Sequence, residues 1–274
     1  MQCQLPLDRP LRAPYLPESL ESMSEYSSSA HRRILGINFL LGDAESMVSS
    51  VMSGGLVVVP SGPGLSDLPV DRAYREAVLN SDFAITDSAL MVYLWNILQR
   101  DRVPRVSGLY YLETLLARQE LRKAGATFWV MPGPESSQRN LCWLRSQGIH
   151  VSDSNVYIAP RYNRPIEDLG LARRLNEIRP SHVFIAVGGG VQEPLGFYLK
   201  RALDFRPSIH CIGAAIAFLS GDQSAIPIWA DRSGLGWLVR CISRPGIYVP
   251  RYWAARRLAG LLIRYREQLP PLRG

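Results

Sequence analysis

One aspartate, Asp87, stands where a carboxylate can do chemistry. It follows a short apolar run, residues 83–86, and precedes Ser88 and a segment whose apolar residues recur at spacings of three and four. This pattern predicts a buried parallel strand that runs directly into a helix. Ligands of open α/β sheets lie at the carboxyl ends of strands, so Asp87 can face a substrate as a general base. The alternative is that Asp87 only caps the helix, because aspartate is a preferred N-cap residue.

A second polar group follows another apolar run, residues 182–187. Three glycines come next, and Gln192 and Glu193 open a helical segment. This is neither a dinucleotide motif nor a P-loop, because Glu193 stands where a third glycine belongs and no GK[ST] follows. Gln192 and Glu193 are polar groups at the carboxyl end of a predicted strand, which makes them candidates for hydrogen bonding to a sugar or ribose. Close packing of strand and helix would also explain the glycines.

Neither metal nor cofactor chemistry is predicted. No two aspartates stand two residues apart, so the DxD pattern that holds a divalent metal on a nucleotide-sugar is missing. The four histidines are scattered, and the four cysteines lack the spacing of a zinc site. The GxSxG turn of acyl hydrolases is also missing.

Strand and helix patterns alternate along the chain and predict how these residues are positioned. Apolar runs predict strands at residues 34–38, 56–59, 83–86, 127–131, 156–159, 182–187 and 209–214. Alternation of this kind indicates an α/β fold, with a Rossmann-like, mostly parallel sheet and helices on both faces. A turn-rich loop at residues 60–64 is expected to lie over a ligand. We divide the chain into a mobile leader (1–32), an α/β catalytic domain (33–232) and a basic helical appendage (233–274).

The positive charge is concentrated at the C-terminus. The chain carries a net charge of +7, and residues 240–274 contain eight arginines and one acidic residue, which together equal that charge. A basic segment on a neutral body indicates an anionic partner. A final helix is expected at residues 250–268, with one apolar face. That face can either pack on the domain or lie in a membrane interface.

Several short segments taken together resemble the WecG/TagA/CpsF glycosyltransferase family. Their order and spacing match from about residue 34 to residue 252. The segments are DFAITD at 82–87, RVSG at 105–108, Gly188 with Gln192 and Glu193, IGAAIAFLSGDQSAIP at 212–227, GLGWLVR at 234–240 and RPGIYVPRY at 244–252.

The resemblance implies an inverting, metal-independent transfer of a sugar. The donor is a UDP-sugar, and the acceptor is a sugar linked to polyprenyl diphosphate. Asp87 falls on the family's catalytic aspartate, and the C-terminal appendage is expected to close over the active site and to meet the membrane. Substrate binding is expected from matched segments and from the loop at 60–64, through Ser61, Arg105, Gly188, Gln192, Glu193, Arg240, Arg244, Arg251 and Tyr252. The arginines would stabilise the leaving diphosphate.

Two other functions compete with this interpretation. Ser88 stands where the family has glycine, and Gly236 where it has glutamate. These departures favour a non-catalytic, membrane-attached scaffold in polysaccharide assembly. The net charge suggests a nucleic-acid-binding protein, but the neutral body and the lack of an aromatic and basic strand face argue against it.

The expected location is the cytoplasmic side of the cell membrane, with peripheral attachment to anionic lipid. No apolar run approaches the roughly 18 residues of a membrane-spanning helix. The sequence leaves a homo-oligomer open and names neither the sugar nor the linkage.

Overall fold

A single eight-stranded sheet lies at the centre of the computed structural model, which describes residues 31–223 and 227–273. The strand order is β1-β2-β4-β3-β8-β7-β5-β6. Only the β1–β2 pair is antiparallel among these neighbours. The strands are β1 (His31–Ile34), β2 (Ile37–Leu40), β3 (Gly55–Val58), β4 (Phe83–Ala84), β5 (Thr127–Met131), β6 (Val156–Ile158), β7 (His182–Ile185) and β8 (Ser208–Cys211).

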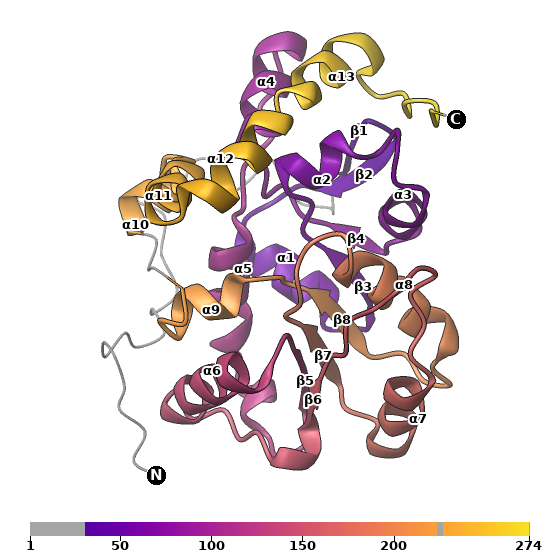
Figure 1. Ribbon diagram of the computed structural model, residues 1–274, viewed down its shortest axis with the longest axis vertical. Coiled ribbons are helices and arrows are strands. Elements are labelled where there is room, and N and C mark those ends of the chain that lie inside the picture. The colour runs from indigo at the N-terminus through magenta and orange to yellow at the C-terminus, as the bar shows by residue number, and fades with distance from the viewer. Residues whose placement is uncertain (1–30, 224–226, 274) are drawn as a thin grey trace.

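Helices cover both faces of the sheet, as the alternating pattern predicted (Figure 1). Successive strand residues point to opposite faces, so Val57 joins one apolar core while Leu56 and Val58 join the other. The first core contains α1 (Ala44–Val51), α5 (Gly108–Leu116), α6 (Pro134–Ser146) and α9 (Ala215–Leu219). The second contains α2 (Gly62–Ser66), α3 (Arg72–Leu79), α4 (Ala89–Gln99), α7 (Leu169–Ile178), α8 (Gln192–Ala202) and α13 (Arg257–Tyr265).

Three further helices lie together to the left of the sheet in Figure 1, above α9. They are α10 (Ile228–Arg232), α11 (Gly236–Ser243) and α12 (Pro245–Ala254). Short 3₁₀ turns occupy Gln119–Arg122 and Asp153–Asn155. Residues 1–30 of the predicted leader lie outside the described residues, and its last two residues, His31 and Arg32, instead begin β1.

The predicted single strand at residues 34–38 is wrong, because the chain reverses there to form a hairpin. Leu35 and Gly36 adopt φ values of 49° and 82°, the left-handed geometry that tight hairpin turns require at both central residues. The C-terminal segment holds this turn. Leu35 N–H donates to the carbonyl of Arg266 at 2.8 Å, and Gly36 N–H donates to that of Glu267 at 2.9 Å.

The turn-rich loop at residues 60–64 also differs from expectation. Its second half forms α2, whose N-cap is Ser61. The last helix is not continuous, because α12 ends at Ala254 and α13 begins at Arg257. At this junction the main-chain N–H groups bond to the carbonyl three residues earlier, as in a 3₁₀ turn, instead of four residues earlier. Ser66 Oγ also donates to the carbonyl of Ala255 at 3.4 Å.

The apolar face of α13 packs on the body of the protein. Leu258 and Leu262 are fully buried, and the helix lies against α2 and α4. Burial of this face excludes the alternative in which it lies in a membrane interface. The basic side of α13, which includes Arg257 and Arg264, stays exposed.

A buried chain of three polar rings connects the first core to the sheet. Tyr111 Oη lies 2.8 Å from His210 Nδ1, and His210 Nε2 lies 3.1 Å from Nδ1 of His182. Burial lowers the pKa of His182 to about 4. Burial, together with the neighbouring His182, lowers the pKa of His210 well below its ordinary value. Both rings are therefore neutral in the folded protein at neutral pH.

The two buried neutral histidines predict a loss of stability in mild acid. An unfolded histidine has a pKa of about 6.5, so between pH 6.5 and 4 the unfolded state binds more protons than the folded state. The stability that comes from keeping these rings neutral is fully present above pH 6.5. As the pH falls below that value, each ring lowers the free energy of unfolding by up to about 1.4 kcal/mol per pH unit. Urea unfolding of wild type and His182→Asn from pH 7 to pH 4.5 measures it. The variant should show the smaller slope, and equal slopes would contradict the assignment.

Candidate active site

One cavity of about 130 Å³ brings together most of the predicted site residues. It lies at the carboxyl ends of four adjacent strands, β4, β3, β8 and β7, where open α/β sheets bind ligands. Its lining includes Ser61, Asp87, Gly188, Gln192, Arg240 and Tyr252. Arg105, Glu193 and Arg244 are not in the lining. Arg251 lies in α12, and its side chain is outside the described part of the structure.

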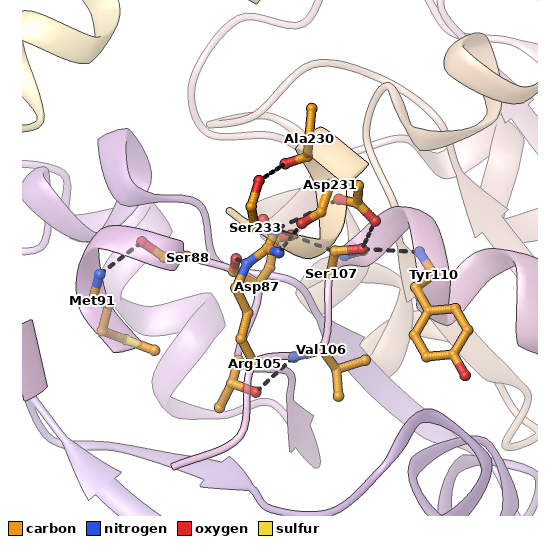
Figure 2. A network of polar contacts seen from close by, with 12 residues as sticks. Asp87, Ser88, Met91, Arg105, Val106, Ser107, Tyr110, Ala230, Asp231 and Ser233 are labelled. Carbon is orange, nitrogen blue, oxygen red and sulfur yellow. Dashed lines mark hydrogen bonds and ion pairs between the residues drawn. The ribbon is translucent and has the colours of Figure 1, made fainter. Parts of the chain in front are cut away.

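Asp87 is not the cap of the helix that follows it. Ser88 is the N-cap of α4, with its hydroxyl accepting a hydrogen bond from Met91 N–H at 3.3 Å. Figure 2 shows the Ser88 hydroxyl directed to Met91 at the start of this helix, and Asp87 in a separate network beside Arg105. The capping alternative for Asp87 is therefore wrong, and the carboxylate is available for another role.

The start of α5 fixes one oxygen of the Asp87 carboxylate. Asp87 Oδ1 accepts a hydrogen bond from Gly108 N–H at 2.8 Å, at a helix N-terminus that favours negative charge. A larger residue at position 108 would force its neighbours to shift, since a Cβ would lie 2.8 Å from Cγ1 of Val59. Asp87 Oδ2 makes no hydrogen bond to any described residue, and the side chain is 28% exposed. One oxygen is thus held and the other can accept a proton.

Arg105 holds the main chain of Asp87 rather than lining the cavity. Its Nε donates to the Asp87 carbonyl at 2.9 Å, and its Nη1 donates to the Asp231 carbonyl at 2.5 Å. Its Nη2 lies 3.6 Å from Oδ1 of Asp231 and 4.0 Å from Oδ1 of Asp87. The guanidinium therefore links the strand end at Asp87 to α10 (Figure 2).

Asp231 and Ser107 complete this link. Ser107 Oγ donates to Asp231 Oδ2 at 2.6 Å and accepts from Tyr110 N–H at 3.1 Å as the N-cap of α5. Both residues are buried. Thr86 positions the same loop, because its hydroxyl donates to the carbonyl of Pro104 at 2.7 Å.

Gln192 presents an unpartnered oxygen at the cavity. The side chain is 6% exposed, and its Oε1 has no hydrogen-bond partner among the described residues. Its Nε2 donates to Glu193 Oε1 at 2.9 Å, and Glu193 Oε2 accepts from Gly190 N–H at 3.2 Å. Glu193 thus orients the Gln192 side chain and the glycine segment at 188–190. An orphaned buried acceptor of this kind suits a donor group of a ligand.

Arg240 covers the cavity from α11. Its guanidinium lies 4.6 Å above the ring of Phe218, and its Nη1 donates to the Tyr252 hydroxyl at 3.2 Å. Tyr248 lines the same cavity and donates to Gln223 Oε1 at 3.2 Å, which ties α12 to the loop after α9. Arg244 is exposed and borders an adjoining crevice with Tyr248.

Sequence reasoning missed three residues that build the site: Gly108, Asp231 and Tyr248. Gly108 belongs to the RVSG segment at 105–108. Its position after Ser107 at the start of a helix could have indicated that its N–H is available to a carboxylate. Asp231 is the single acidic residue between Asp222 and Glu267, which suggests a buried partner for an arginine. Nothing in the sequence around Tyr248 distinguishes it from neighbouring aromatic residues.

The fold and site define an α/β protein with a carboxylate at a strand end and a cationic helical cover. This helical cover consists of α10, α11, α12 and α13. The model of the glycosyl transferase WecG/TagA/CpsF family matches residues 32–271. The chain belongs to this glycosyltransferase family, which confirms the resemblance of the short motifs. Among curated proteins, no sequence matches the chain.

Proposed function

We propose that the protein is an inverting, metal-independent glycosyltransferase of cell-surface polysaccharide biosynthesis. It moves a sugar from a UDP-sugar to a sugar linked to polyprenyl diphosphate. The observation that carries the proposal is Asp87, which lines the cavity with one carboxylate oxygen fixed by Gly108 and the other unbonded among the described residues. Family membership supports the reaction class.

Asp87 acts as the general base in a single displacement. The acceptor hydroxyl gives its proton to Asp87 Oδ2 while its oxygen attacks the anomeric carbon. The bond between that carbon and the diphosphate oxygen breaks, and the electron pair leaves with UDP. Attack opposite the leaving group inverts the anomeric configuration.

Arginine side chains stabilise the charge that develops on the leaving diphosphate. The described residues contain no cluster of three or more His, Cys, Asp or Glu that could hold a metal ion. Arg240 lies at the cavity, and its buried Nε has no hydrogen-bond partner among the described residues. A guanidinium fork suits phosphate oxygens. Arg251 and Arg244 are the further candidates from the same helical cover, and Ser61, Gly188, Gln192 and Tyr252 contact the substrates.

Two neighbouring substitutions should separate catalysis from folding. Asp87→Asn should lower kcat by about 100-fold or more, because it removes the base. It should leave stability unchanged, since the amide oxygen still accepts from Gly108. Ser88→Ala removes a helix cap outside the cavity, so it should cost about 1 kcal/mol of stability and leave kcat near normal. Turnover of a panel of UDP-sugars and urea unfolding measure both effects.

Different results would revise different parts of the proposal. Normal turnover by folded Asp87→Asn would remove Asp87 as the base. If wild-type protein turns over none of the UDP-sugars with any lipid-diphosphate acceptor, the scaffold alternative is favoured instead. Complete loss of activity in EDTA, restored by Mg²⁺ or Mn²⁺, would reject charge stabilisation by arginine alone.

A membrane-facing surface is proposed on α10, α11 and α12. No helix in the described residues is long and apolar enough to cross a membrane. These three helices nevertheless expose large apolar side chains at Trp229, Trp237, Leu238, Ile242, Val249 and Trp253. Arg256 lies 4.4 Å above the Trp253 ring. Tryptophan beside arginine suits the interface of an anionic bilayer, here the inner face of the cell membrane.

A negative charge introduced on this surface should release the protein from anionic vesicles. Ile242→Glu and Trp253→Glu change side chains that are 74% and 67% exposed. Each should weaken binding at least roughly tenfold, because a buried apolar side chain contributes about 1.5–3 kcal/mol. Leu169→Glu is the matched control, since Leu169 is 75% exposed on α7. Sedimentation with vesicles measures binding, and equal effects of all three changes would contradict the proposed surface.

A further inference from the structure

A second cavity lies beside α13 and shares no lining residue with the cavity at Asp87. Its volume is about 310 Å³, within the range of small-molecule sites. Three segments form it: the end of α2 with the following loop, one side of α13, and the C-terminal tail. Figure 1 shows this tail running from α13 towards α3.

Three arginines bring positive charge to this cavity. Arg257 and Arg264 lie two turns apart on one side of α13, and Arg273 comes from the tail. None of them forms an ion pair with a described residue. Among the described residues that line the cavity, none is acidic. Three guanidinium groups without a described counter-charge therefore converge on one space.

The walls of the cavity are fixed by hydrogen bonds. Arg273 N–H donates to the carbonyl of Pro69 at 2.7 Å. Arg75 donates to the carbonyls of Leu68 and Pro270, one on each of the two segments that face α13. The tail is thus held on the loop that follows α2, which keeps Arg273 opposite the arginines of α13.

Gly260 leaves the space between these walls open. It lies in the interior of α13 and lines the cavity, and a Cβ built there would meet nothing within 4 Å. Glycine inside a helix costs about 1 kcal/mol relative to alanine, and close packing does not require it here. A larger side chain at this position would extend into the cavity between Arg257 and Arg264.

We propose that this cavity binds a phosphate-bearing anion through Arg257, Arg264 and Arg273. Guanidinium groups donate paired hydrogen bonds that match phosphate oxygens, and three of them suit a group with more than one negative charge. The same chemistry belongs to soluble phosphates and to the headgroup of an anionic phospholipid. Val70 lines the cavity and is 55% exposed, so an apolar part of such a ligand has a surface to contact.

Calorimetry on the full-length protein at 0.15 M salt tests this site with three probes: inorganic phosphate, inorganic pyrophosphate and dihexanoyl-phosphatidylglycerol below its micelle concentration. Arg264→Gln should weaken binding of at least one probe by about tenfold, the effect of losing a charge-assisted hydrogen bond. Gly260→Leu keeps every charge and fills the cavity, so it should abolish that binding. The preferred probe then identifies the source as soluble phosphate or lipid headgroup.

Two control variants distinguish binding at this site from non-specific electrostatic attraction of anions and from binding in the cavity at Asp87. Arg145→Gln removes an exposed positive charge near Asp153, far from the lining residues in sequence, and should leave the binding unchanged. Arg240→Gln removes the arginine at the other cavity. Binding lost only in Arg240→Gln, lost equally in Arg145→Gln, or retained in Gly260→Leu would overturn the proposal. None of these outcomes depends on glycosyltransferase activity.

Discussion

The Arg105 guanidinium is the contact on which the arrangement of the site depends. It bonds the main-chain carbonyl of Asp87 on one side and that of Asp231 on the other. The end of the sheet and helix α10 are thereby joined directly beside the Asp87 carboxylate. Because Asp231 also accepts from Ser107, the cap of α5, the same contact fixes the helix whose first N–H holds Asp87 Oδ1.

The helical cover supplies a second set of constraints. Burial of Leu258 and Leu262 between α2 and α4 anchors its C-terminal end, while Tyr248 and Arg240 make the contacts at the cavity. A segment held at both ends can present cations to the active site on one side and leave apolar side chains exposed on the other. Because the apolar face of α13 is buried, the membrane-facing surface is proposed on α10, α11 and α12 instead.

Local patterns predicted what local physics decides. The strand before Asp87, the helix after it and the parallel sheet with helices on both faces follow from apolar periodicity. The hairpin at Leu35 could not be predicted, since leucine rarely adopts positive φ and is held there by a tail more than 200 residues later. The contact between Arg105 and Asp231 likewise joins distant segments that no spacing rule connects.

The central claim is that Asp87 faces the reacting sugar while arginines of the helical cover hold the leaving diphosphate. A crystal structure of the Asp87→Asn variant with an intact UDP-sugar tests this most directly. The account predicts the diphosphate within hydrogen-bond distance of Arg240, and the face of the anomeric carbon opposite the diphosphate turned towards position 87. A diphosphate bound away from Arg240, or an anomeric carbon that faces away from position 87, would contradict it.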